Sequence, residues 1–460
     1  MFISETRTLF ETKSANLQRL YNVAESKCRL NLRDFAGRRV LIEGGGYNKI
    51  WLETQPMGGE MYAGRDLTAA LNNSLLFMEL QRGDGRIPGS IENQPNGLAA
   101  QFNKFQGFFF AAPALNLYYW LGRDKAYLNQ LYDCLARFDE YLWRVRDSDG
   151  DGCLESWCVT DTGEDGAVRY GDAPFWWTED VPPTGYSVVP IASMDVTGFS
   201  VSARDTLADI SNILQNGKAD EWREKANDVR ARIRSRLWID DRGACFDRDR
   251  GGRIMPTLLH NNLRLMYWRC LSQGMAGRFV SEHLLNPDEF WTRAPLPSVA
   301  ANDPLFRNNS GNDWSGQPEG LTYQRAIRAL ENYGYETLLA PIADRFFAAI
   351  GSDCIFTQQF DPFVGRRSGD IDGYGPSMLA TLGYIEHLYG VHMEREELWW
   401  SARGGMECEF TLTIGDKTFA LRGSGERYEG TINGRQVITA ESGFRVVSDH
   451  NGNIIRRIRL

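Results

Sequence analysis

Apolar residues recur at helical spacing along most of the chain. In the segment from residue 14 to residue 30, Leu17, Leu20 and Tyr21 fall on one face of a helix. Asp66 is a suitable N-cap for a second such segment, which ends near Gln81. The same spacing predicts further helices over residues 108–121, 125–145, 195–214, 218–237, 258–270, 319–333, 335–350 and 377–389. Because loops bearing Gly and Pro separate these helices, we expect hairpins that close into a ring.

The hydrophobic pattern changes after residue 394. Short alternating runs cover residues 410–414, 417–421, 429–432, 437–439, 444–447 and 452–455, and Gly, Asn and Asp separate them. Alternation of this kind, interrupted by turn residues, is typical of antiparallel strands. We therefore expect a mainly α protein with a helical domain over residues 1–394 and a small antiparallel β domain over residues 395–460.

Composition and charge exclude several classes of function. The chain has 460 residues, of which 24% are charged and 42% hydrophobic, as is ordinary for a soluble globular protein. The net charge is −9 and no run of Lys or Arg stands out, so we expect no nucleic-acid partner. No apolar run approaches the ~20 residues of a membrane span, and the first residues do not resemble a secretory signal. The eight Cys lack metal-site spacing and indicate reduced thiols, which predicts a cytoplasmic protein without a cofactor. The sequence does not decide between a monomer and a homo-oligomer.

Candidate chemistry is concentrated in the segment Gly163–Tyr170. It places Asp165 four residues before Arg169, and Trp176 and Trp177 follow shortly after. Indole rings can cover the apolar face of a pyranose while a carboxylic acid protonates a glycosidic oxygen. The segment therefore favours a sugar site. The alternative is an exposed turn with a surface ion pair, which would carry little significance.

Two further loops contain aromatic and polar side chains that suit a sugar. The loop from residue 51 to residue 65 offers Trp51 for stacking, and Glu53, Gln55 and Arg65 for hydroxyl groups. Two consecutive glycines in this loop let the backbone approach a ligand closely. The sharp turn over residues 81–89 adds Arg86 as a ligand contact.

A later group of polar residues comprises Trp314, Gln317, Glu319 and Gln358. Glu319 directly precedes a predicted helix. It is either a partner for the positive end of that helix or a carboxylate that points into the ring. No histidine lies in any of these loops, which argues against histidine-based catalysis.

One acidic stretch superficially resembles a calcium loop. Asp147, Asp149 and Asp151 have the required spacing, but Cys158 stands where such a loop needs a bidentate Glu. We therefore expect a tight acidic turn and no metal site.

These motifs resemble the six-hairpin (α/α)6-barrel glycosidases of the trehalase and glycoside hydrolase family 63 group, which includes mannosylglycerate hydrolases. Residues 162–170 match without a gap the segment of form S-G-x-D-x-S-x-R-[WFY] that carries the general acid in that group. The resemblance implies an (α/α)6 toroid in which Asp165 is the acid and Arg169 contacts the substrate. It covers roughly residues 40–392, and only the Asp165 motif is specific.

One departure from the group concerns the catalytic base. Gln358 stands where the group has a Glu, and an amide cannot take a proton from water. Glu319 is our first candidate for the base and Asp370 the second. We expect an inverting, exo-acting glycoside hydrolase for a short oligosaccharide or small glycoside, with its two carboxyls about 6.5–9.5 Å apart. The alternatives are a non-catalytic carbohydrate-binding protein on a glycosidase scaffold, and a sugar isomerase or lyase on the same barrel.

Overall fold

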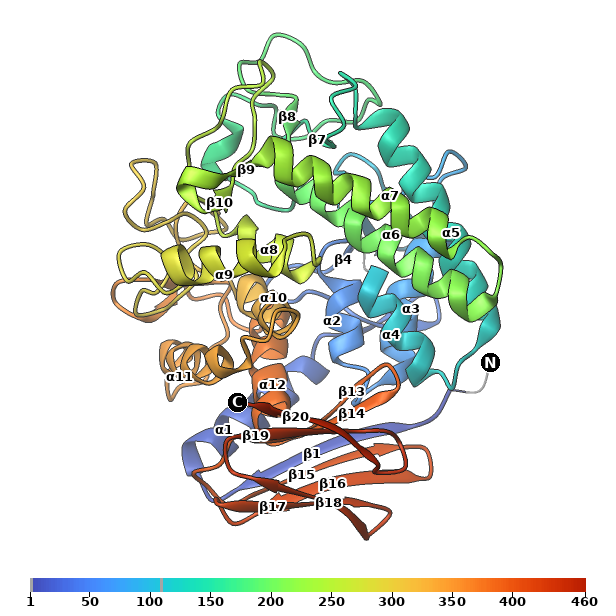
Figure 1. Cartoon of the computed structure of the whole chain (residues 1–460), viewed down its shortest axis with the longest axis vertical. Coiled ribbons are helices and arrows are strands. Elements are labelled where there is room, and N and C mark those ends of the chain that lie inside the picture. Colours follow the sequence, from blue (N-terminus) through green and yellow to red (C-terminus); the bar gives the residue numbers. More distant parts are fainter. Residues whose placement is uncertain (1–2, 108–110) are drawn as a thin grey trace.

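The computed structural model describes residues 3–107 and 111–460, and helices are the main regular elements of this part (Figure 1). Its α-helices are α1 (Ala15–Arg29), α2 (Gln55–Met61), α3 (Leu67–Glu79), α4 (Ala111–Trp120), α5 (Lys125–Val145), α6 (Met194–Leu214), α7 (Ala219–Arg232), α8 (Asn261–Tyr267), α9 (Gln273–Phe279), α10 (Gly320–Glu331), α11 (Leu339–Ile350) and α12 (Gly375–Tyr389). Short π-helical segments, Ile233–Leu237 and Val280–Leu284, extend α7 and α9.

Six of the described helices contact one another in a cyclic order, each with the next helix of the set. The inner set runs α2, α4, α6, α8, α10 and α12, and α12 contacts α2 again. The helices α1, α3, α5 and α7 pack on α12, α2, α4 and α6, and α11 packs on α10 and α12. This cyclic order of contacts is consistent with the ring of hairpins that the sequence predicts.

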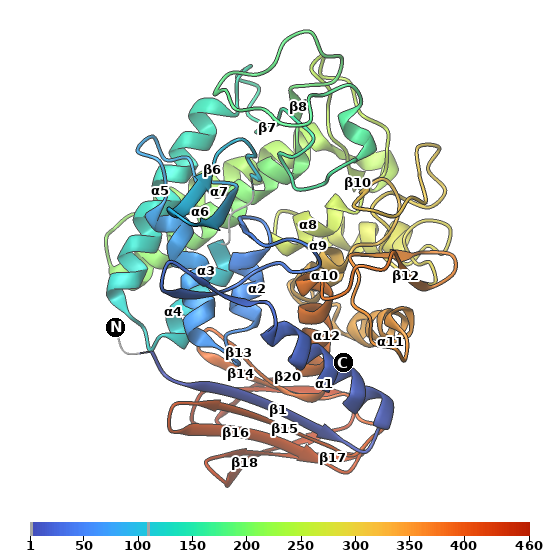
Figure 2. The same cartoon turned by 180° about the vertical axis from the view of Figure 1, so that it is seen from behind.

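Two antiparallel sheets form a β part at the lower end of Figures 1 and 2. One sheet has the order β1 (Thr6–Thr12), β15 (Cys408–Ile414), β16 (Lys417–Gly423), β17 (Arg427–Ile432) and β18 (Arg435–Glu441). The other has the order β13 (Val391–Glu394), β14 (Glu397–Ala402), β19 (Phe444–Ser448) and β20 (Ile454–Arg459). The strands predicted after residue 408 are confirmed. The β part also includes β1, from the start of the chain, and β13, which begins before residue 395; the sequence pattern predicted neither strand.

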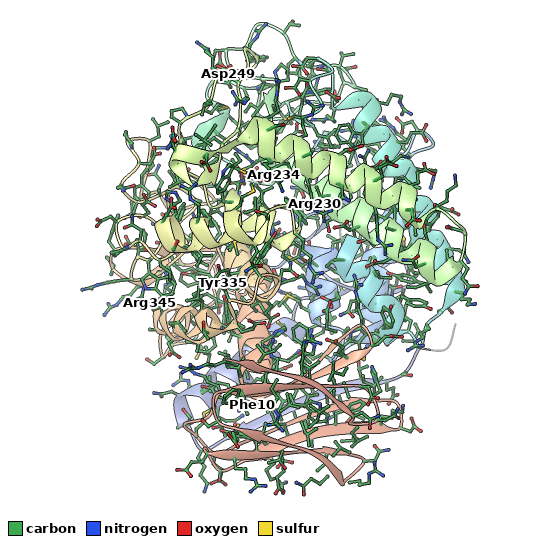
Figure 3. All side chains as sticks on the ribbon, in the orientation of Figure 1. Phe10, Arg230, Arg234, Asp249, Tyr335 and Arg345 are labelled. Atoms are coloured by element: carbon green, nitrogen blue, oxygen red, sulfur yellow. The ribbon has the colours of Figure 1, made fainter. Side chains whose placement is uncertain are left out.

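Phe10, labelled in Figure 3, joins the β part to the helices. Its ring lies 5.4 Å from that of Tyr21 in α1, 6.3 Å from that of Tyr389 in α12 and 6.4 Å from that of Phe410 in β15, between ring centroids. Burial of such aromatic rings contributes strongly to the stability of a core. The β part is therefore packed onto the ring as well as connected to it by the chain.

Short sheets occupy the loops between the helices. They are formed by β2 (Leu32–Phe35) with β3 (Arg38–Leu41); β4 (Ile50–Trp51) with β5 (Ser90–Gln94) and β6 (Gly97–Gln101); β7 (Glu155–Ser156) with β8 (Ile191–Ala192); β9 (Trp238–Ile239) with β10 (Ala244–Cys245); and β11 (Gln359–Asp361) with β12 (Arg366–Ser368). Short 3-10 turns cover Val168–Tyr170, Asp240–Arg242 and Glu336–Leu338. These elements fix the paths of the loops that carry the candidate site.

Capping residues explain where some helices begin. The carboxylate of Asp66 accepts a hydrogen bond of 2.9 Å from the backbone N–H of Ala69, which confirms the predicted N-cap of α3. The sequence pattern missed α2, since this short helix is buried on almost every side and shows no apolar stripe. Its Gly58 and Gly59 allow the close approach of Leu379 and Asn73. The predicted start of another helix at Phe108 lies outside the described residues.

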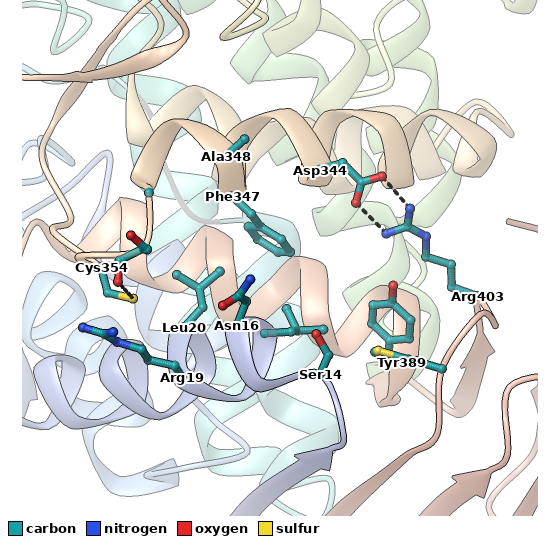
Figure 4. Close-up of a pocket in the computed structure, with 14 residues that line it drawn as sticks. Ser14, Asn16, Arg19, Leu20, Asp344, Phe347, Ala348, Cys354, Tyr389 and Arg403 are labelled. Atoms are coloured by element: carbon teal, nitrogen blue, oxygen red, sulfur yellow. Dashed lines mark hydrogen bonds and ion pairs between the residues drawn. The ribbon is translucent and has the colours of Figure 1, made fainter.

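A groove of about 470 Å³ lies between α1 and α11 (Figure 4). Leu20, Phe347 and Tyr389 line it, and the ion pair between Asp344 and Arg403 lies at one side, with an N–O distance of 2.8 Å. None of the residues that the sequence predicts for a sugar site lines this groove. The eight cysteines are buried, free thiols. Within the described residues, every helix is too short or too polar for a membrane span.

Candidate active site

The candidate site lies where inner helices begin. Glu53, Ser193, His260, Glu319 and Tyr374 each stand just before α2, α6, α8, α10 or α12. Hydrogen bonds join His260 to Glu164, Arg325 of α10 to Glu53, and Tyr374 to Glu43. The N-terminus of a helix carries unpaired N–H groups and partial positive charge. This end of the ring therefore favours negatively charged groups.

Arg169 anchors the Asp165 segment in the interior of the protein. Its guanidinium forms ion pairs with Glu164 and Asp195 at 2.5 Å and with Asp247 at 2.9 Å, and the residue is only 3% exposed. Burial raises the pKa of Glu164, but Arg169 and other cations outweigh this effect and hold the pKa well below its ordinary value. The alternative of a surface ion pair between Asp165 and Arg169 is therefore wrong, because Arg169 is buried and pairs with the neighbouring Glu164.

Asp165 points away from this buried cluster towards the loop before α10. Its Oδ2 accepts a hydrogen bond of 2.9 Å from Nδ2 of Asn312, and its backbone carbonyl accepts one of 3.0 Å from the N–H of Trp314. Asn312 adopts a left-handed backbone conformation with φ of 63°, which is uncommon outside glycine. The indole N–H of Trp314 donates to Asn312 Oδ1 over 3.2 Å. These contacts hold the Asp165 carboxylate in one orientation.

Gln358 is joined to Asp165 through the same asparagine. Its Nε2 donates to Oδ1 of Asn312 over 2.7 Å, and its Oε1 accepts from the hydroxyl of Tyr47 over 3.1 Å. The amide is thus fixed from both ends. The structure brings the predicted acid and the residue at the expected base position within two hydrogen bonds of each other.

Glu319 is a buried carboxyl close to the side chains of Gln358 and Gln359. It is 0% exposed, and among the described residues neither of its carboxyl oxygens has a partner at hydrogen-bonding geometry. Burial raises the pKa of Glu319 well above its ordinary value, and the two nearby glutamine amides oppose this only in part. The backbone of Glu319 bridges that of Gln359, which fixes the start of α10 against β11.

Sequence reasoning missed Glu43, a second enclosed carboxyl of the site. It is 7% exposed and accepts a hydrogen bond of 3.0 Å from the hydroxyl of Tyr374. Burial, reinforced by the charges of Glu53 and Asp165, raises the pKa of Glu43 to about 8. Three consecutive glycines follow it in a left-handed conformation, and this Gly-rich loop was the one available signal in the sequence.

Trp51, Glu53 and Gln55 also lie at this end of the ring. The carboxylate of Glu53 pairs with Arg325 of α10 at 2.9 Å and lies directly against the Cα atom of Gly163, where a side chain would collide with it. The side-chain carbonyl of Gln55 accepts a hydrogen bond of 2.7 Å from the backbone of Trp51. The ammonium group of Lys104 lies 4.9 Å from the centre of the Trp51 ring. A cation therefore lies beside the aromatic surface of Trp51.

The structure does not bring together all the predicted residues. Arg65 lies at the opposite end of α2 and pairs with Glu25 and Glu386. Arg86 is buried and binds the carbonyl groups of Phe102 and Thr178, so it ties loops to each other. Asp370 projects into solvent and pairs with Arg367 at 3.4 Å. Two of the predicted contacts, Arg65 and Arg86, therefore hold structure elsewhere, and Asp370 is not enclosed as a catalytic base requires.

The remaining predicted residues, Trp177 and Gln317, bond to other loop residues. The indole N–H of Trp177 donates to the carbonyl of Val181 over 2.7 Å, which holds this loop together. The amide of Gln317 donates to Asn308 over 2.8 Å. In the acidic turn, Asp147, Asp149 and Asp151 accept hydrogen bonds from nearby backbone N–H groups, as in a tight turn.

Comparison with solved structures shows the fold of a helical glycosidase. Mannosylglycerate hydrolase from Thermus thermophilus, in complex with Tris, aligns with a TM-score of 0.64 at 18% identity, over 79% of this chain and 100% of that chain. Neutral trehalase Nth1 from Saccharomyces cerevisiae aligns with a TM-score of 0.60 at 12% identity, over 79% of this chain and 80% of that chain. A structure named sialidase aligns with a TM-score of 0.74 at 13% identity, over 97% of this chain and 43% of that chain. No curated protein sequence matches the chain.

The fold and the family model together place the protein among the glycosidases. The model of the mannosylglycerate hydrolase MGH1-like glycoside hydrolase domain matches residues 60–377. The chain belongs to this family. The predicted resemblance to mannosylglycerate hydrolases and trehalases is thereby confirmed.

Proposed function

We propose that the protein is an inverting, exo-acting glycosidase on an (α/α)6 toroid, with Asp165 as general acid and Glu319 as general base. The observation that carries this proposal is the hydrogen-bonded path from Asp165 through Asn312 to Gln358, with lengths of 2.9 and 2.7 Å. Through Asn312 it links the proposed acid to the position where the resemblance puts the base. Glu319 is the enclosed carboxyl next to that position.

In this mechanism Asp165 protonates the leaving oxygen while a water attacks the opposite face of the sugar. Glu319 takes a proton from that water, and the fixed amide of Gln358 orients the water molecule. Glu319 must be ionised in the reactive form, whereas its raised pKa favours the protonated form in the free site. We therefore expect slow turnover that increases with pH on the acidic side of its profile.

The substrate that we propose is a short oligosaccharide or a small glycoside. Trp51 supplies an aromatic surface, and Lys104 beside it supplies a cation that suits an anionic leaving group. Mannosylglycerate, named for the relative from Thermus thermophilus, is the first compound to test, followed by trehalose.

Two variants separate the roles of acid and base. Asp165→Asn should lower kcat by about 10²–10⁴-fold for unactivated glycosides, and much less for aryl glycosides whose leaving group needs no proton. Glu319→Ala should lose activity and regain it with azide, which needs no deprotonation. Full activity of folded Glu319→Ala without azide removes Glu319 from the mechanism, and equal losses of Asp165→Asn on both substrate classes remove Asp165 as acid.

Gln358 also favours a second candidate function, which is carbohydrate binding without turnover. Both ends of its amide are engaged, and no carboxylate stands at the position where the related enzymes have their base. Calorimetric binding of a sugar, combined with no product by NMR after long incubation, would support this alternative over hydrolysis.

A further inference from the structure

A second cluster of ionisable side chains lies at the other end of the inner helices, against the β part. It contains Glu386 and His387 at the end of α12 and His392 in β13. One ligand atom from each of these three residues lies within 4.8 Å of the others. Both imidazoles are at least nine-tenths buried.

We propose that Glu386, His387 and His392 bind a divalent transition-metal ion of the zinc type. Two imidazoles and one carboxylate are a ligand set that such ions prefer. The ion would replace the hydrogen bond between Oε1 of Glu386 and Nδ1 of His392, which are 2.8 Å apart, and the proton that these atoms share would be released to solvent. Nε2 of His387 would be the third ligand. The proposal is independent of the glycosidase mechanism, because it uses none of the same residues.

Each proposed ligand is held from behind by another group. Nδ1 of His387 lies 2.7 Å from the carboxylate of Glu331, which fixes the ring and leaves Nε2 for a metal. Nε2 of His392 lies 3.6 Å from Glu394, and the second oxygen of Glu386 lies 3.4 Å from Arg65. Carboxylates behind metal-bound imidazoles are a recurrent feature of metal sites.

The charges around these residues leave room for two positive charges. The network comprises five carboxylates, of Glu25, Glu60, Glu331, Glu386 and Glu394, and three guanidinium groups, of Arg65, Arg328 and Arg445. The carboxylates therefore outnumber the guanidinium groups by two. Buried charge without compensation is costly, and one divalent cation supplies the missing charge.

A cavity beside the cluster has space for a metal-bound water. Its volume is about 210 Å³, and His387, His392 and Gln324 line it. Gln324 is 2% exposed, and its side-chain carbonyl oxygen has no hydrogen-bond partner among the described residues. An acceptor placed in this way suits a proton of a water that occupies the fourth position on the ion. Because the ligands come from α12 and β13, the ion would connect the ring with the β part.

Cobalt titration of the full chain tests this site. The protein is first treated with a chelator, and Co²⁺ binding is followed by visible absorption. We expect one equivalent to bind, zinc to displace it, and His392→Gln to weaken binding by at least about 100-fold. His283→Gln is the matched control, because His283 also pairs with a glutamate, at 2.7 Å, but belongs to no three-residue cluster of metal-ligand side chains in the described part of the chain.

Two outcomes would overturn the proposal. One is the absence of saturable Co²⁺ binding to the wild-type chain. The other is equal affinity of the wild type and the His392→Gln variant. X-ray absorption of the zinc-loaded wild type provides a reading that does not depend on how the variant folds. Imidazole scattering from two histidines is expected there, and a shell of oxygen alone would contradict the site.

Discussion

The two ends of helix α10 place a glutamate in opposite environments. Glu319, just before the helix, is buried and forms no ion pair with any described residue, and burial raises its pKa well above the ordinary value. Glu331, the last residue of the helix, pairs with Arg445 and His387, each at 2.7 Å. Burial alone would raise its pKa, but these two partners lower it to about 2.

This difference runs against the helix dipole. The dipole stabilises an anion at the N-terminus and disfavours one at the C-terminus, with a contribution of about 0.3–1 kcal/mol. The ion-pair partners of Glu331 therefore outweigh it. A buried carboxyl without an ion pair is costly, and this cost is a reason to propose a functional role for Glu319, whereas the ion pairs of Glu331 stabilise the end of α10.

The largest expected effect separates these two glutamates by stability. Glu331→Gln leaves Arg445 buried without its partner and should destabilise the protein by about 3–5 kcal/mol. Glu319→Gln removes a buried acid that has no ion pair and should leave the free energy of unfolding within about 1 kcal/mol of the wild type, or raise it. Urea denaturation of both variants at pH 7 measures this. Equal destabilisation by Glu331→Gln and Glu319→Gln would contradict the difference between the two ends of α10.

A smaller effect concerns the pH dependence of stability at the site end. The pKa of Glu43 rises from an ordinary value of 4.5 to about 8 in the folded chain. Its contribution to stability is fully present below pH 4.5 and is lost as pH rises towards 8, because the unfolded chain releases the proton first. Glu43→Gln should remove this loss, so its stability relative to the wild type should increase by about 2 kcal/mol or more between pH 5 and 8.

Parallel denaturation curves for the two proteins over that range are the measurement. A relative stability that stays constant with pH would show that Glu43 is ionised in the folded chain.

The smallest effect addresses the missing base directly. Gln358→Glu puts a carboxylate at the position that the resemblance assigns to the base, beside the path to Asp165. We expect initial hydrolysis rates to increase by about tenfold or more, since base catalysis no longer depends on the buried Glu319. Gln358→Met is the matched variant without charge and should not gain activity. An unchanged rate in Gln358→Glu would indicate that proton removal does not limit turnover.

Periodicity was sufficient to predict amphipathic helices such as α5 and α11, because each has one apolar face. It could not predict α2, whose Gly58 and Gly59 are enclosed by neighbouring helices, or β1, whose partner strand β15 lies at the other end of the sequence. The motif over residues 162–170 singled out Asp165 as the proposed acid because its spacing is specific. Glu43 and the burial of Arg169 could not be predicted, since they depend on which loops meet at the ends of the inner helices.

The central claim is that Asp165 and a second carboxylate catalyse hydrolysis with inversion. The most direct test is the anomeric NMR spectrum of the first product formed from mannosylglycerate or another accepted glycoside. Wild type and Asp165→Asn are compared under conditions in which both proteins are folded. We predict that the wild type releases the inverted anomer before mutarotation and that the variant releases almost none. Release of the retained anomer, or undiminished turnover by the folded variant, would contradict it.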